Sequence, residues 1–435
     1  MRAVSCVATA AAVALMCTSV ALGGRLVSVG YRAPAALHGL HVVQRLPGLR
    51  TAEVRVRDRR AERALRARPG IRFVQRVVPR AETGGPIFPS ATSISVPEWQ
   101  WTAMHADQVP QWVLQQAAGV TIAVIDTGAD VTVPTIAAKH PITYNVATGG
   151  TVVQDFVGHG TFVASLAGGA ISDPSGMAGF GGEARLMIVQ ANRGGTAFSD
   201  IDEANAIVWA VDQGAKIVNL SLGGSQTSLV ERDAVEYAVN HGVLLVAAAG
   251  NAAQDGNPVV YPAALIGRHG LVVGASTAGG ARAPFSTTGS YVDVLAPGVD
   301  VLGALAGDIP EGFFLPASTP GATGNYGFGS GTSYAAPEVA GAAALVWATN
   351  PTLDSAGVAA MIEASASGQG VWTQELAFGN VDAAAAVQRA SGGVVPQLTP
   401  SALPAKAKVS KPRVGPTRVR TKAARAKPLV HERPR

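Results

Sequence analysis

Cysteine is almost absent from this chain of 435 residues: Cys6 and Cys17 are the only two. Both lie in a stretch where one basic residue, Arg2, precedes a run without charge from Ala3 to Leu22. This pattern predicts a secretory signal peptide over residues 1–23, although the run is also long enough to suggest a membrane anchor. Its many small residues favour the signal peptide. Removal of that peptide leaves no cysteine, which excludes disulfides, thiol catalysis and cysteine-ligated zinc.

Charged and aromatic residues are also scarce, at 14% and 6%, whereas there are 51 glycines and 48% of residues are hydrophobic. Such a composition argues against a disordered chain or a coiled coil, and the length is sufficient for two domains with a full core. No repeat of about 20–50 residues is present, so a solenoid or propeller is not indicated. The sequence also contains no P-loop and no complete G-x-G-x-x-G, so no nucleotide site is indicated.

The net charge of +5 conceals an uneven distribution. Residues 24–85 contain 14 arginines and four acidic residues, and residues 391–435 contain 11 basic residues and one glutamate, so each segment carries +10. The body between them, residues 86–390, carries −16. The basic overall charge therefore does not predict a nucleic-acid partner; it reflects two basic extensions beside an acidic globule, which weakly favours basic substrates.

The two extensions differ in their predicted structure. Residues 24–85 combine expected strands at 41–46, 53–57 and 71–78 with a helix at 58–68, which indicates a small α+β domain. Residues 81–98 are rich in Gly, Pro, Ser and Thr and resemble a linker. Residues 391–435 have no periodicity and predict a disordered tail. That tail either binds an anionic cell-surface polymer or membrane, or is a solvated extension that proteolysis trims.

The body alternates buried strands with helices. Strands are expected at 120–125, 186–190, 217–222, 243–248 and 271–275, and helices at 161–167, 199–213 and 229–241. Continuous apolar strands separated by helices predict a doubly wound, mainly parallel α/β sheet with helices on both faces. Polar residues at the ends of such strands are candidates for a functional site.

Three polar clusters lie at such positions. Asp126 ends a strand and is followed by Thr-Gly, His159 is flanked by glycines at a helix start, and Ser333 follows a glycine turn at the start of a long helix. Taken singly, Asp126 and Ser333 are also explained as helix caps. Taken together, they are the three groups that nucleophilic catalysis by serine needs: a base to take the hydroxyl proton and an acid to orient that base. No G-x-S-x-G surrounds Ser333, and the chain order Asp, His, Ser is the order of subtilisins.

The region from Val96 to Val387 resembles the secreted serine proteases of the subtilisin family, or subtilases. The resemblance rests on the motifs at Asp126-Thr-Gly, Gly158-His-Gly-Thr, Gly331-Thr-Ser-Tyr-Ala-Ala-Pro, Asn219-Leu-Ser-Leu-Gly-Gly and Ala247-Ala-Ala-Gly-Asn251. It implies that Asp126, His159 and Ser333 form a catalytic triad and that Asn251 donates to the oxyanion. It also implies substrate-binding walls, on which a peptide adds as a strand; these are Ser221, Leu222, Gly223, Ala248, Ala249 and Gly250.

The resemblance further implies that residues 24–85 are a propeptide, which acts as folding chaperone and intramolecular inhibitor until cleavage near residues 80–85. The charges of +10 and −16 independently favour its docking on the body. The resulting prediction is a secreted serine endopeptidase that acts on polypeptides through an acyl-enzyme. The alternative is a subtilase fold that has lost catalysis and binds peptides or a surface.

The chain departs from the family pattern at several positions. Glu338 stands where a histidine is usual; we expect it in the first turn of the helix with Pro337, and, if near His159, to raise the pKa of that residue. Phe162 and Tyr334 replace a histidine and a methionine, and both replacements look tolerable. Residues 131–141 lack the family's His-Pro-Asp-Leu stretch and so an acid expected to bind calcium. No cofactor is therefore expected, and the sequence does not support calcium binding.

Overall fold

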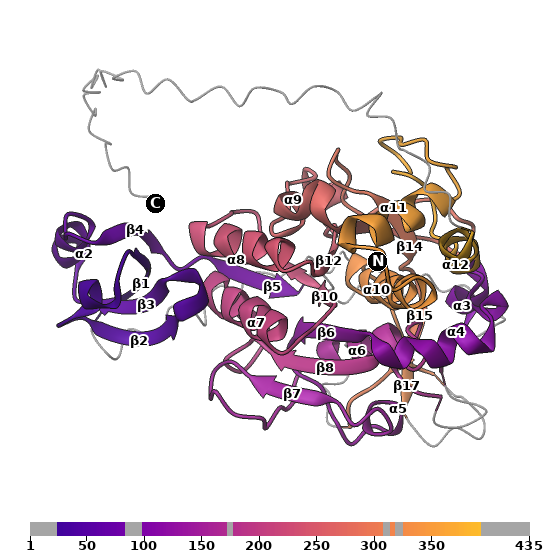
Figure 1. Ribbon diagram of the computed structural model, residues 1–435, viewed down its shortest axis with the longest axis horizontal. Helices are drawn as coiled ribbons and strands as arrows, with labels where there is room; N and C mark the ends of the chain where they lie inside the picture. Colours follow the sequence, from indigo (N-terminus) through magenta and orange to yellow (C-terminus); the bar gives the residue numbers. More distant parts are fainter. Residues whose placement is uncertain (1–23, 83–97, 172–176, 308–313, 318–324, 393–435) are drawn as a thin grey trace, which may run out of the picture. The chain divides into compact units, whose positions relative to one another are not determined.

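The computed structural model describes residues 24–82, 98–171, 177–307, 314–317 and 325–392 (Figure 1). The predicted signal peptide, most of the predicted linker and the basic tail beyond residue 392 lie outside these ranges, and so do the predictions made for them.

A seven-stranded parallel sheet forms the centre of the fold. Its strands run in the order β14-β13-β12-β10-β6-β8-β7, and each neighbouring pair is parallel. β6 lies between β8 and β10, and the strands later in the chain add to the sheet on both sides of it. The sheet is therefore doubly wound, as predicted. The strands are β6 (Thr121–Asp126), β7 (Ile142–Asn145), β8 (Arg185–Gln190), β10 (Ile217–Leu220), β12 (Leu244–Ala248), β13 (Leu271–Ser276) and β14 (Val294–Pro297).

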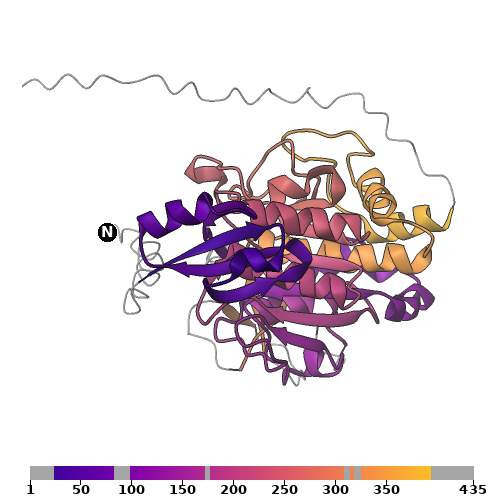
Figure 2. The same ribbon diagram turned by 60° about the vertical axis from the view of Figure 1, so that its left-hand side comes forward.

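Helices cover both faces of this sheet (Figures 1 and 2). Side chains alternate along each strand, so Val124 packs into the core on one face and Ile125 into the core on the other. The first core includes α6 (His159–Gly168), α10 (Thr332–Thr349), α11 (Ser355–Ser365) and α12 (Ala383–Ser391), and the second includes α7 (Asp200–Asp212), α8 (Leu229–Asn240) and α9 (Ala263–Ile266). The helices expected at 161–167, 199–213 and 229–241 are thereby confirmed within two residues.

Residues 25–76 form a separate antiparallel sheet with the order β2-β3-β1-β4. Its elements are β1 (Arg25–Tyr31), β2 (His41–Leu46), β3 (Thr51–Val56), α2 (Arg59–Arg66) and β4 (Ile71–Arg76). Asp58 caps α2 by accepting a hydrogen bond from Ala61 N at 2.8 Å. The sequence interpretation found each of these elements except β1. Their apolar side chains form a core of their own.

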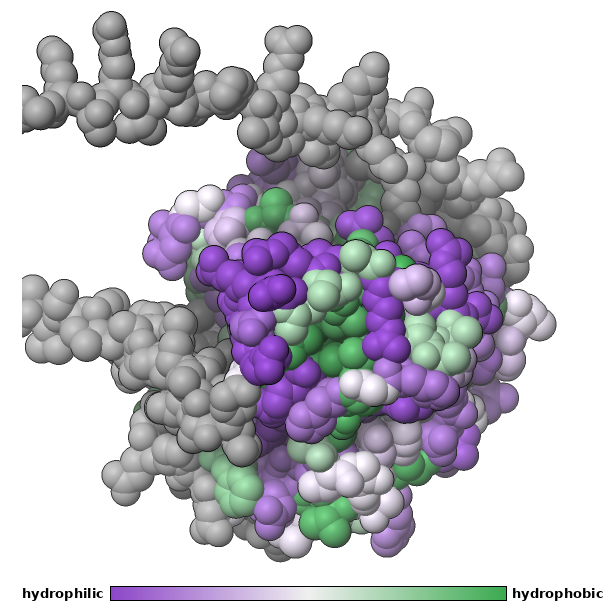
Figure 3. Space-filling model, turned by 90° about the vertical axis from the view of Figure 1, so that its left-hand side faces the viewer, coloured by the Kyte–Doolittle hydropathy of each residue, from purple (hydrophilic) through white to green (hydrophobic). Residues whose placement is uncertain are grey.

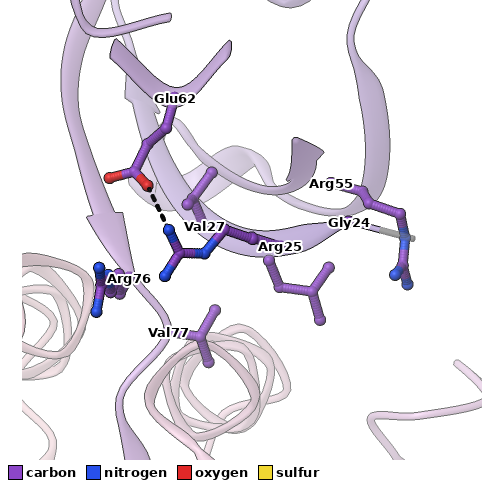
Figure 4. A pocket seen from close by; sticks show the side chains of 8 residues that line it. Gly24, Arg25, Val27, Arg55, Glu62, Arg76 and Val77 are labelled. Atoms are coloured by element: carbon purple, nitrogen blue, oxygen red, sulfur yellow. Dashed lines mark ion pairs between the residues drawn. The ribbon is translucent and has the colours of Figure 1, made fainter. Parts of the chain in front are cut away.

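The surface of this antiparallel unit is largely hydrophilic around a smaller hydrophobic area, as its many arginines require (Figure 3). A pocket of about 300 Å³ opens between β1, β4 and α2, where Arg25 and Glu62 form an ion pair at 3.9 Å (Figure 4). None of the candidate site residues lines this pocket.

A second, smaller sheet joins the N-terminal unit to the body. β5 (Pro79–Glu82) pairs antiparallel with β11 (Leu222–Gly223) on one side and with β9 (Ala197–Ser199) on the other. The remaining described strands and helices lie around the body: α3 (Trp99–Ala103), α4 (Gln111–Gln116), α5 (Pro134–Ala137), β15 (Val301–Ala304), β16 (Leu315–Ala317) and β17 (Tyr326–Gly329).

Candidate active site

Three of the predicted residues lie at the carboxyl edge of the parallel sheet. Asp126 is the last residue of β6, His159 is the first residue of α6, and Ser333 lies in the first turn of α10. His159 Nδ1 and Asp126 Oδ1 are 2.8 Å apart, and both side chains are buried. The start of α6 can lie this close to the end of β6 because residue 160 is a glycine. A Cβ at Gly160 would lie 2.1 Å from the carbonyl oxygen of Gly128.

A buried carboxylate that the sequence interpretation missed holds the start of α6. Asp155 accepts hydrogen bonds from Gly158 N and Thr161 N, both at 2.8 Å, and from the Thr161 hydroxyl at 2.7 Å. It also accepts one from Thr127, the residue after Asp126, at 2.9 Å. Asp155 therefore links the end of β6 to the helix that carries His159. No local motif marks it, because its partners lie on two separate elements.

Ser333 is held against the end of β10. Its hydroxyl donates to the carbonyl of Ser221 at 3.2 Å, and the Ser221 hydroxyl donates to the carbonyl of Ser333 at 2.8 Å. The aromatic ring of Tyr334, the next residue, lies 5.6 Å from the imidazole of His159, centroid to centroid. The Nε2 atom of His159 is buried and has no hydrogen-bond partner among the residues that the structure describes.

Thr332 holds the side chain of Asn251 through hydrogen bonds to its carboxamide oxygen. Its carboxamide oxygen accepts from both the backbone nitrogen and the hydroxyl of Thr332, each at 2.9 Å. The Thr332 hydroxyl in turn accepts from Gly250 N at 3.0 Å. The oxygen of the Asn251 carboxamide is therefore identified by its two donors, and the nitrogen is the donor atom of this side chain.

The residues predicted to bind substrate lie in two buried stretches. Ser221 follows β10, and Leu222 and Gly223 form β11. Ala248 ends β12, and Ala249 and Gly250 follow it. Gly250 has a φ of +104°, and a Cβ there would lie 2.6 Å from Val260 Cγ2. Strand β5 of the chain itself covers β11, with Ala81 opposite Gly223 and Glu82 opposite Leu222.

Strand β5 also brings a charge to the histidine. Burial lowers the pKa of His159, but Asp126, Glu82 and Asp155 outweigh burial and raise that pKa to about 9. Burial raises the pKa of Glu82 to about 7, and His159 partly opposes this shift. Asp126 makes the largest contribution to this rise, and Glu82 of β5 adds to it.

The structure corrects the expectations for Glu338 and Pro337. Both lie in the second turn of α10, which begins at Thr332, and not in its first turn. The carboxyl of Glu338 is fully buried, and neither oxygen has a hydrogen-bond partner in the part of the chain that is described. Burial raises the pKa of Glu338 well above its usual value. Glu338 is not among the groups that raise the pKa of His159, which are Asp126, Glu82 and Asp155, so the expected effect on that residue is not found.

The described residues contain neither a metal-binding cluster nor a membrane-spanning helix. No group of three or more His, Cys, Asp or Glu side chains there is arranged to hold a metal ion. No helix in the same ranges is long and apolar enough to cross a membrane.

Comparison with known proteins places this geometry in context. Residues 117–389 match a model of the Subtilase family. Thermitase of Thermoactinomyces vulgaris is 35% identical over 288 residues, which cover 65% of this chain and 93% of thermitase. A thermophilic serine proteinase of Bacillus sp. (strain AK1) is 36% identical over 236 residues, and the match covers 54% of this chain but only 53% of that protein.

Subtilisin E of Bacillus subtilis (strain 168) is 34% identical over 265 residues, covering 58% of this chain and 61% of subtilisin E. Among solved structures, fervidolysin of Fervidobacterium pennivorans, described as a keratinolytic enzyme related to subtilisin, superposes with a TM-score of 0.74 at 26% identity. That match covers 86% of this chain and 62% of fervidolysin.

Proposed function

The chain belongs to the subtilase family, and we propose that it is a secreted serine endopeptidase that matures by cutting its own N-terminal segment. In this proposal Ser333 is the nucleophile and His159 its general base. Asp126 orients the imidazole, and Asn251 with the backbone nitrogen of Ser333 binds the oxyanion. The substrate is a polypeptide that pairs with Ser221, Leu222 and Gly223 as an added strand.

The observation that carries the proposal is the 2.8 Å bond between His159 Nδ1 and Asp126 Oδ1. It leaves Nε2 as the nitrogen that is not bonded to Asp126, and Tyr334, the residue after Ser333, packs near the imidazole. A Ser333 hydroxyl that turns from the Ser221 carbonyl to Nε2 gives up its proton as it attacks the substrate carbonyl. His159 then passes that proton to the leaving amine. In the second half of the reaction His159 takes a proton from water, which attacks the acyl-enzyme, and returns a proton to Ser333.

Residues 24–85 are proposed to be the inhibitory propeptide. β5 pairs with the strand that substrate would use, and its Glu82 contributes to the raised pKa of His159. Further contacts support docking on α7 and α8: Arg72 forms an ion pair with Asp233 at 3.1 Å, and Val78 N donates to Asp200 at 2.9 Å. A chain in this state is inactive because β5 occupies the strand position that a substrate would take.

The experiment is to express the chain with its N-terminal segments as wild type, as Ser333→Ala and as Ser391→Ala. The last is a control because Ser391 is exposed at the end of α12. We expect wild type and Ser391→Ala to lose the mass of about residues 24–85 and to hydrolyse casein, and Ser333→Ala to do neither.

If folded Ser333→Ala hydrolyses casein as wild type does, the assignment of the nucleophile is wrong. If all three folded chains are inert, the endopeptidase proposal fails, and a peptide-binding function replaces it. If Ser333→Ala is processed but inert, only self-cleavage is overturned, because another protease then removes the segment.

A further inference from the structure

The side chain of Arg80, on β5, is fully buried between two glutamates of the body. Its Nε lies 3.1 Å from Glu203 Oε2 and 2.9 Å from Glu231 Oε1, and its Nη2 also donates to Glu231 Oε1. All three side chains have no exposed surface. Glu203 comes from α7 and Glu231 from α8, so the two helices form a socket around the guanidinium.

The socket holds three carboxyl groups around one guanidinium, and burial raises the pKa of each of them. Asp200, at the start of α7, adds a third carboxylate close enough to raise the pKa of Arg80. Glu231 also caps α8 through Ser228, and Asp200 accepts from the backbone of Val78, so both have other partners. Glu203 differs: it is fully buried, and its Oε1 has no hydrogen-bond partner among the residues placed by the structure. Among the described residues, Glu203 accepts a hydrogen bond from Arg80 alone.

This socket opens into the groove proposed for substrate. β5 lies between β9 and β11, with Arg80 opposite Phe198, Ala81 opposite Gly223 and Glu82 opposite Leu222. β11 directly follows Ser221, whose carbonyl contacts the Ser333 hydroxyl. If a substrate strand binds in the same register as β5, the third residue after its arginine lies opposite Ser221. Because the Ser221 carbonyl contacts the Ser333 hydroxyl, the peptide bond that follows this third residue is the one expected to be cleaved.

When β5 leaves, the three carboxyl groups lose the guanidinium that pairs with them. Buried carboxylates are stable only when paired, so the emptied socket favours a substrate that restores the positive charge. Arginine suits it better than lysine, because a guanidinium remains charged when buried and offers donors along one planar edge. A neutral side chain leaves the carboxylates unpaired.

We propose that Asp200, Glu203 and Glu231 form a specificity subsite that selects an arginine at the fourth residue before the cleaved bond. The inference rests on the proposed endopeptidase function and adds a substrate class to it. Arg80 occupies the subsite in the uncleaved chain as a substrate arginine would after maturation.

The test uses the full chain after maturation and internally quenched peptides with the sequence of residues 77–88. One series carries arginine, lysine, leucine or citrulline at the position of Arg80; citrulline retains the shape of arginine without its charge. Because a site built for a polar group strongly rejects analogues that lack it, we expect kcat/KM at least about 100-fold lower for citrulline and leucine than for arginine. Lysine should fall in between, and mass spectrometry should place the cut after the third residue following arginine.

Two variants locate the effect. Glu203→Gln should lower kcat/KM for the arginine peptide about 10-fold or more and leave the citrulline peptide nearly unchanged, because it removes one buried charge partner. Glu236→Gln is the matched control, since Glu236 is exposed on α8. If Glu203→Gln does not mature, the wild-type peptide series still decides the question.

Equal hydrolysis of the arginine and citrulline peptides by a matured chain that cuts casein would overturn the subsite and leave the endopeptidase function intact. The same holds if the preferred arginine lies at another distance from the cut. If folded, matured chain cuts neither casein nor any peptide, the proposed function fails, and the subsite fails with it.

Discussion

Ser221 and Ser333 are joined by two reciprocal hydrogen bonds, in which the hydroxyl of each donates to the backbone carbonyl of the other. The two residues are 112 positions apart. Asn219 adds a third contact, since its amide nitrogen donates to the Ser221 hydroxyl at 3.0 Å. The start of α10 is therefore fixed to the end of β10, and the proposed nucleophile is positioned by the strand on which substrate is proposed to bind.

Replacement of Ser221 by alanine should destabilise this junction. In a Ser333→Ala background, which prevents self-digestion, Ser221→Ala leaves the backbone carbonyl at position 333 and the amide of Asn219 without their buried partner. We expect the free energy of unfolding to fall by about 1–3 kcal/mol. Urea unfolding at equilibrium measures this, with exposed Ser225→Ala as control. A loss no larger than that of the control contradicts the prediction.

Thr332 should affect catalysis through Asn251 rather than through binding. Thr332→Val removes the hydroxyl that donates to the Asn251 oxygen but keeps the backbone bond to the same atom. In this family, loss of the amide donor itself costs about 2.7–4 kcal/mol in the transition state, so a loosened donor should lower kcat by about 10-fold with KM nearly unchanged.

Steady-state kinetics on one peptide separate the two constants for Thr332→Val. Thr349→Val, at the far end of α10, is the control and should leave both constants near their wild-type values. A raised KM with unchanged kcat would show that Thr332 serves substrate binding instead.

The charge of Glu82 should be visible in the titration of His159. With a pKa of about 7, Glu82 is ionised in the range where His159 titrates, near pH 9, and it stabilises the imidazolium. In uncleaved Ser333→Ala chain, Glu82→Gln should therefore lower the pKa of His159. NMR titration of the imidazole, assigned with His159→Gln, measures the shift. Glu98→Gln, at another half-buried glutamate whose pKa is also raised by burial, is the control; an unchanged or higher pKa of His159 in Glu82→Gln refutes the coupling.

Glu338 should make stability depend on pH without affecting the pH profile of activity. In the folded chain burial raises its pKa well above 4.5, whereas in the unfolded chain it ionises near that value. Its contribution to stability is complete below pH 4.5 and falls as the pH rises toward the folded pKa, by about 1.4 kcal/mol per unit. Glu338→Gln should therefore gain stability relative to its parent as the pH rises from 4.5.

Unfolding of Glu338→Gln and its parent at several pH values, both in the Ser333→Ala background, tests this sign. Exposed Glu375→Gln should show no such trend. In active chain, Glu338→Gln should leave the acid limb of the pH–rate profile where it is, because Glu338 is not among the groups that shift the pKa of His159. If the acid limb moves to lower pH in Glu338→Gln, Glu338 does raise the pKa of His159, as the sequence predicted.

Sequence alone determined those features that depend on neighbouring residues. Apolar runs between helical stretches predicted the strands β6, β8, β10, β12 and β13 and the helices α6, α7 and α8, because the period of apolar side chains reflects how an element is buried. The runs did not predict β7, β9 or β14. The motifs around Asp126, His159, Asn251 and Ser333 also predicted which residues the fold gathers at one edge of the sheet. Parallel strands with crossover helices bring their carboxyl ends to that edge, so position along the chain was sufficient.

Tertiary structure decided what depends on contact between distant segments. The socket of Arg80 joins residues 123 and 151 positions away, and no local pattern distinguishes Glu203 or Glu231 from other helix glutamates. Asp155 and Thr332 position His159 and Asn251 through bonds that cross between elements. Glu338 was misjudged for the same reason: the charge of a carboxyl depends on the water and partners around it, and only the packed fold determines both.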